Sequence, residues 1–169
     1  MANELFIAAG TATVWTDSGG DKLMDMGGLA ADALVMGAFL DLGAGARSQW
    51  YELELFIDGF NTAPAVGAVV AVHLMQSNAT TNFDGNPTSD PTVSLEGTIT
   101  EDQAKNGISV PGVRVYSTTA GDELKSRYVV RLVARYVSPV VHNKTAVALL
   151  STADAHTLTL TPIPTQLQG

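Results

Sequence analysis

The sequence predicts an all-β protein, folded as an antiparallel sandwich or barrel of about nine or ten strands. Short apolar runs, several of them alternating with polar residues, recur along the whole chain. Clusters of turn-forming residues separate these runs at roughly even spacing, which is typical of sandwiches and barrels. No run combines helical periodicity with a clear helix cap, so we expect no long helix. The length of 169 residues suits a single domain over 1–169.

The first expected strands cover residues 11–17 and 34–43. The earlier run alternates and ends at the turn signal Ser18-Gly19-Gly20, and the later one is apolar and ends in Gly-Ala-Gly. Residues 28–40 also allow a helical interpretation, which Gly37 and the lack of a cap weaken. For residues 1–30 two alternatives stay open: the first strands of the sandwich, or an N-terminal arm that contacts a partner.

The next two expected strands cover residues 50–58 and 66–76. In the first, apolar and polar residues alternate. This pattern predicts an apolar inner face and an outer face with three acids, namely Glu52, Glu54 and Asp58. The second is apolar on both faces, which predicts a strand covered on both sides.

Residues 77–91 form a loop by composition, and strands are expected again at 92–100 and 110–117. The loop carries oxygen-bearing side chains at Asn82, Asp84, Asn86 and Asp90. Calcium binding is therefore one interpretation of the 78–91 segment, although the spacing lacks the EF-hand glutamate and fits an Asx-rich turn better.

The run 126–137 is expected to be one strand with a row of arginines on its outer face. Arg127, Arg131 and Arg135 alternate there with valines, while the other face is apolar. A helix satisfies the same four-residue spacing and remains the alternative. We expect these arginines to pair across the sheet with the acids of 50–58, for example Arg131 with Glu54. A surface for an acidic protein partner or for nucleic acid is the other interpretation of the row.

The last expected strands cover residues 145–151 and 156–163, and no motif for catalysis accompanies them. His73, His142 and His156 lie in or beside apolar runs, and no two of them have metal-ligand spacing. The sequence lacks a nucleophile elbow, a P-loop, a dinucleotide-binding glycine motif and a zinc-protease motif. We therefore expect no enzyme activity, no cofactor and no metal site.

Charge and composition restrict the class of partner. The net charge is −8, and there are no cysteines, which excludes disulfides. Residues 1–103 hold 14 acids and 2 bases, whereas residues 104–169 hold 3 acids and 7 bases. Overall acidity argues against nucleic-acid binding, and the lack of a long apolar stretch argues against a secretory signal and a membrane span. Only 15% of the residues are charged, which indicates a surface that a partner covers in part or that Ser, Thr, Asn and Gln keep polar.

Two stretches resemble small virion proteins of tailed bacteriophages. They are "YVSPVVHNKTAVALLSTADAHTLTLTPIPTQLQ" (136–168) and "YELELFIDGFNTAPAVGAVVAVHLMQS" (51–77). The resemblance implies a jelly-roll β-sandwich that decorates or cements a capsid and that has no catalytic residues. The short acidic loop at 78–91 departs from this pattern and leaves the contacts with the shell open.

The expected function is therefore that of a capsid decoration protein on the outer surface of a virion, made in the host cytoplasm. Its partners would be the major capsid protein and its own copies, as a homodimer or homotrimer, because such interfaces are large and apolar. The alternative is a carbohydrate-binding sandwich whose sugar platform is formed by aromatic side chains: Trp15, Trp50, Tyr51, Tyr116 and Tyr128.

Overall fold

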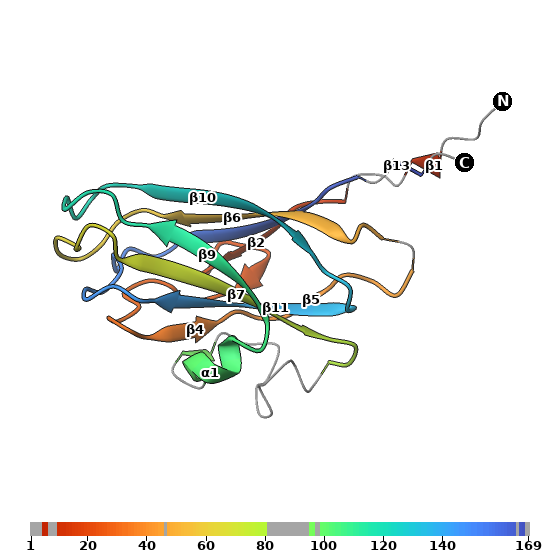
Figure 1. The fold of residues 1–169 in the computed structure, drawn as a ribbon, viewed down its shortest axis with the longest axis horizontal. Helices are drawn as coiled ribbons and strands as arrows, with labels where there is room; N and C mark the ends of the chain where they lie inside the picture. The colour runs from red at the N-terminus through yellow and green to blue at the C-terminus, as the bar shows by residue number, and fades with distance from the viewer. Residues whose placement is uncertain are drawn as a thin grey trace.

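The protein is a sandwich of two β-sheets, which confirms the predicted fold class. The computed structural model describes residues 10–45, 47–80 and 99–164, together with the backbone of short strands at 5–6, 95–96 and 166–167. In that part of the chain the only α-helix is α1 (Glu101–Ala104), which is too short to span a membrane. The two sheets lie face to face, and both chain ends leave the same end of the sandwich (Figure 1).

Sheet I has the strand order β10-β6-β12-β2-β3. All neighbours are antiparallel except β2 and β3. Its strands are β10 (Leu124–Arg131), β6 (Trp50–Ile57), β12 (Thr157–Pro162), β2 (Thr13–Thr16) and β3 (Lys22–Leu23).

Sheet II has the order β8-β4-β11-β7-β9, and β5 also pairs with β11. Its strands are β8 (Leu95–Glu96), β4 (Leu34–Met36), β11 (Tyr136–Asn143), β7 (Val69–Ser77), β9 (Ile108–Arg114) and β5 (Leu40–Asp41). A third pair, β1 (Leu5–Phe6) with β13 (Gln166–Leu167), belongs to neither sheet.

The connectivity is that of a jelly roll. In chain order the pairs are β2 with β12, β4 with β11, β6 with β10, and β7 with β9. Each early strand thus pairs with a late one, as if a long hairpin with β7 and β9 at its tip had been rolled up. This winding gives the two Greek-key sheets of a jelly roll.

The core explains why the alternating sequence takes this form. The inward residues of β6, namely Tyr51, Leu53, Leu55 and Ile57, are at most 4% exposed. They pack against the inward residues of sheet II, such as Val72 and Val141. β7 and β11 are apolar on both faces because a second cluster, which includes Ile99 and Ala104 of α1, covers the outer face of sheet II.

Several expected strands differ from the structure. The run 34–43 divides into β4 and β5. Residues 126–137 are not one strand: β10 ends at Arg131 in sheet I, and β11 begins at Tyr136 in sheet II. Residues 145–151 form no strand beyond a single bridge between Leu149 and Phe60. The helical interpretations of 28–40 and of the arginine run do not hold either, because no helix forms there.

The arm alternative does not apply to most of residues 1–30. Residues 13–16 form the strand β2 inside sheet I, and Trp15, Met24, Met26 and Leu29 are buried in the core. Among the described strands of residues 1–30, β1 is the one that belongs to neither of the two sheets, since it pairs with β13.

Candidate interaction surface

Part of the predicted charge row forms ion pairs, and these pairs centre on Glu54. β10 and β6 are neighbours, and Arg127 lies opposite Glu54. Arg127 Nε lies 2.5 Å from Glu54 Oε2 and 3.9 Å from Glu52 Oε1, while Lys125 Nζ lies 2.7 Å from Glu54 Oε1. Burial raises the pKa of Glu54, but the hydrogen bonds from Lys125 and Arg127 outweigh this and hold the pKa below its usual value. These cations therefore meet acids of the same chain.

The other members of the row lie elsewhere. Arg131 is opposite Trp50, not Glu54, and its guanidinium donates to Gln49 Oε1 at 2.9 and 3.2 Å. Asp58 lies just beyond β6, where its backbone N–H donates to His156 Nδ1 at 3.2 Å. The expected pairing of Arg131 with Glu54 was therefore wrong, because the register places them four residues apart.

Arg135 has a separate acidic partner. Its guanidinium binds both carboxylate oxygens of Asp41 at 2.9 and 2.7 Å and lies 4.8 Å from the centre of the Tyr136 ring. These bonds lower the pKa of Asp41 to about 2. The bidentate pair joins the start of β11 to β5.

The expected sugar platform does not form as one surface. Trp15 and Tyr51 belong to the core, at 1% and 4% exposure. Trp50 lies opposite the last residue of β10, whereas Tyr116 lies beside the first. Seven strand steps, or about 23 Å, separate those positions.

Each histidine contacts a polar group of the protein. His73 Nδ1 lies 2.7 Å from Ser109 Oγ, and His142 Nε2 lies 3.2 Å from Asp32 Oδ1. His156 accepts the Asp58 N–H, and its Nε2 lies 2.8 Å from the Leu150 carbonyl oxygen. No group of three or more acidic or histidine side chains within the described ranges could hold a metal ion. The possible calcium ligands Asn82, Asp84, Asn86 and Asp90 lie outside the described residues.

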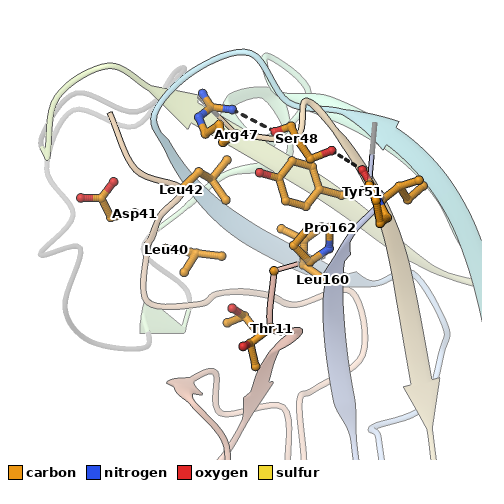
Figure 2. A pocket seen from close by; sticks show the side chains of 13 residues that line it. Thr11, Leu40, Asp41, Leu42, Arg47, Ser48, Tyr51, Leu160 and Pro162 are labelled. Carbon is orange, nitrogen blue, oxygen red and sulfur yellow. Dashed lines mark hydrogen bonds between the residues drawn. The ribbon is translucent and has the colours of Figure 1, made fainter. Parts of the chain in front are cut away.

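A pocket of about 340 Å³ opens at the end of the sandwich where the chain termini leave. Leu40 and Leu42 form one wall, and Leu160 and Pro162 form the other (Figure 2). Gly10 and Pro164, the points where the terminal segments depart, also line it.

The charged groups of this pocket, Arg47 and Asp41, are already engaged. The guanidinium of Arg47 donates to the carbonyl oxygens of Leu132, Val133 and Ala134 at 3.3, 2.9 and 2.6 Å. Asp41 is held by Arg135, and burial raises the pKa of Tyr51. No local motif in the sequence marks Arg47, because these partners lie more than 80 residues away along the chain. The lining residues offer apolar walls and no free acid–base pair.

Two exposed apolar side chains lie at the same end of the sandwich as the pocket, next to the lining residues Tyr51 and Arg47. Trp50 is 43% exposed at the start of β6, and Val133 is 59% exposed just after β10. We call this surface, formed by Trp50, Val133, the pocket and the departure points Gly10 and Pro164, the terminal end. It is the feature of the described chain best suited to bury apolar area against a partner.

Comparisons with family models, curated protein sequences and solved structures find no match to this chain.

Proposed function

We propose that the chain is a non-enzymatic structural protein of a virus particle. It binds the outside of an assembled capsid and reinforces it through contacts with the major capsid protein and with its own copies. The observation that supports this proposal most directly is the terminal end. Two exposed apolar side chains lie there beside a pocket with apolar walls, and Gly10 and Pro164 lead from it into the terminal segments.

The chemistry of the surface is consistent with a role in assembly. The outer face of sheet I carries ion pairs that neutralise one another, as between Glu54 and its two cations, together with the threonines of β12. Burial of such a surface against another protein would cost less than burial of the same charges without partners. A jelly roll is also a scaffold that viral capsid domains share, although a fold alone does not fix a function.

The test is co-sedimentation with empty shells assembled from the major capsid protein of the virus that would carry this chain. Trp50→Ala and Val133→Asp should each reduce the bound fraction at least about tenfold, since central apolar anchors dominate interface energies. Val66→Asp is the matched control, because Val66 is 61% exposed in the loop between β6 and β7, at the opposite end.

Light scattering after size-exclusion chromatography should show a dimer or trimer at the concentrations used for shell binding. Absence of shell binding by the unaltered protein would refute the proposal. Equal loss of binding in Val66→Asp would refute the assignment to the terminal end.

A further inference from the structure

Strand β10 has a free edge. It is the last strand of sheet I, and among the described strands it pairs only with β6. The Leu132 N–H donates to the Gln49 carbonyl, and the Ile163 N–H donates to the Trp50 carbonyl, both at 2.8 Å. Antiparallel bonding alternates along a strand, so odd-numbered residues of β6 bond to β10 and even-numbered ones to β12. On β10 this leaves the backbone groups of four residues pointing away from β6: Lys125, Arg127, Val129 and Arg131.

The neighbouring strand β9 does not fill this edge. It belongs to sheet II, and its ladder with β7 is interrupted by a bulge at Pro111 and Gly112. A side-chain bond crosses the seam, from Tyr128 Oη to the Gly112 carbonyl at 2.6 Å, but β9 and β10 form no ladder. A groove of about 410 Å³ follows the seam, with Tyr116, Ser126 and Arg114 among its lining residues.

The edge carries an excess of positive charge and is partly apolar. Lys125 and Arg127 are paired with Glu54, so the excess comes from Arg131 at the end of β10. The side chains of Lys125, Arg127 and Arg131 share the outer face of β10 with Val129, which is 63% exposed. The guanidinium of Arg131 donates to the neutral amide of Gln49. Among the described residues, no carboxylate lies within 4 Å of Arg131 or of Arg114 across the groove.

These charges decide between two occupants of the edge. If two copies paired their β10 strands antiparallel about a two-fold axis, Lys125 and Arg127 of one copy would lie near Arg131 and Val129 of the other. Like charges directly opposite destabilise a strand pair, and positive residues on an edge strand are a known safeguard against self-association. A strand with carboxylates at alternate positions would instead pair with Arg131 and would share Lys125 and Arg127 with Glu54.

We propose that the free edge of β10 binds an extended acidic segment of a partner protein, which adds to sheet I as a further strand. The added strand would bond to the backbone of Lys125, Arg127, Val129 and Arg131 and place its carboxylates beside the basic side chains. Side chains on its other face would enter the groove beside Tyr116 and Ser126. This site adjoins the terminal end at Arg131, which lies opposite Trp50, but it does not rest on the proposed function.

The test uses the full chain and a fluorescein-labelled peptide of the length of β10, with Glu alternating with Val and Thr. Fluorescence anisotropy should show saturable binding that weakens as salt rises. A peptide with Lys in place of Glu, and one with a central Pro, should bind at least about tenfold more weakly.

Val129→Pro is the informative variant, because it removes an N–H that points away from β6 and leaves the β10–β6 ladder intact. It should lose peptide binding, whereas the matched control Val129→Thr, which keeps the N–H, should retain it. If Val129→Pro does not fold, judged by circular dichroism, the double variant Lys125→Glu/Arg131→Glu should reverse the preference and bind the Lys peptide.

Three results would overturn the proposal. The first is no binding of the acidic peptide, and the second is equal binding of the Glu and Lys peptides. The third is a dimer in sedimentation velocity that Val129→Pro abolishes, since this would assign the edge to a second copy. Shell binding through the terminal end should be unchanged in Val129→Pro, so the two proposals can fail separately.

Discussion

At the scale of single residues, polar side chains far from any candidate surface hold the irregular parts of the fold. Asn143 is fully buried, and its Nδ2 donates to the carbonyls of Leu29, Ala30 and Val147 at 2.9–3.0 Å. Its Oδ1 accepts from Thr145 Oγ1 at 2.7 Å. Both ends of this amide are thus engaged, which is what burial of a polar group requires.

Among the described glycines, Gly112 leaves the least room for a side chain. Its φ is +70°, and a Cβ built there would lie 1.9 Å from the Val70 carbonyl oxygen. We expect Gly112→Ala to destabilise the protein by about 3 kcal/mol or more, because it adds backbone strain to a clash with a central strand. Urea unfolding measures the change.

Gly121→Ala is the control for this measurement, because a Cβ at Gly121 meets no atom within 4 Å. Its free energy of unfolding should stay within about 0.5 kcal/mol of the unaltered value. Similar losses in the two variants would contradict the role given to Gly112.

At the scale of elements, the sequence predicts strands well where one face is buried and poorly where the chain changes sheet. β6 and β12 alternate inside and outside, so their expected bounds, 50–58 and 156–163, lie within one residue of the observed ends. The run 126–137 alternates just as well, yet residues 132–135 form a corner. That corner is held by Arg47, whose partners no local pattern could indicate.

The same reason explains the failure at residues 145–151. Their apolar residues predict a strand. The Val147 carbonyl, however, accepts hydrogen bonds from the side chains of Asn143 and Thr145 and is not available to a strand ladder. Local side-chain bonds of Asn and Thr commonly compete with regular structure in this way. The candidate surfaces could not be predicted from the sequence either, because the exposure of Trp50 and Val133 depends on which strands lie beside them.

The β6–β10 register can be tested by reversing one ion pair. Arg127→Glu should destabilise the protein by about 1 kcal/mol, since it places a third acid beside Glu54 and Glu52. The double variant Arg127→Glu/Glu54→Arg should recover about half of this loss, because exposed pairs contribute little. Thermal unfolding of the four proteins completes the cycle.

Arg131→Glu combined with Glu54→Arg provides the contrast. The register places Arg131 opposite Trp50, so Glu54→Arg should give no rescue of Arg131→Glu. Rescue of Arg131→Glu but not of Arg127→Glu would show that the register is wrong.

The outer face of sheet II should make stability depend on pH. His73 is 5% exposed there, beside α1. An ion pair between Glu101 of α1 and Lys144, the residue after β11, links this helix to sheet II. Burial, followed by the nearby His142, lowers the pKa of His73 to about 4 from 6.5. Between these values the unfolded chain binds more protons than the folded one, so stability falls as the pH falls from about 6.5 to about 4.

Urea unfolding at pH 7 and pH 5 measures this effect. His73 should contribute about 2 kcal/mol to the difference, and His73→Gln should remove that share, leaving the smaller contribution of His156. The carboxyl groups of Glu101 and Asp41 have pKa values of about 2, so their titration affects stability only below about pH 4.5. An unchanged difference in His73→Gln would contradict the assignment.

At the scale of the whole molecule, the roll brings the first and last strands together and so fixes where both terminal segments leave. β2 pairs with β12 next to the pocket, and the segments beyond them pair again as β1 and β13, outside both sheets (Figure 1). A two-stranded pair alone is only marginally stable in water, so we expect it to gain its stability from a partner. This restricts the arm idea to the residues before Gly10.

Removal of residues 1–9 tests that restricted idea. The sandwich should fold with a melting temperature within about 3 °C of the full chain, because β1 pairs with no strand of either sheet. Binding to empty shells should fall, since the truncation removes one strand of the pair that projects from the terminal end.

Removing residues 165–169 should have the same effect, because β13 is the other strand of that pair. Unchanged shell binding in both truncated proteins would confine docking to Trp50, Val133 and the pocket. A large drop in melting temperature would instead show that the terminal pair supports the sandwich itself.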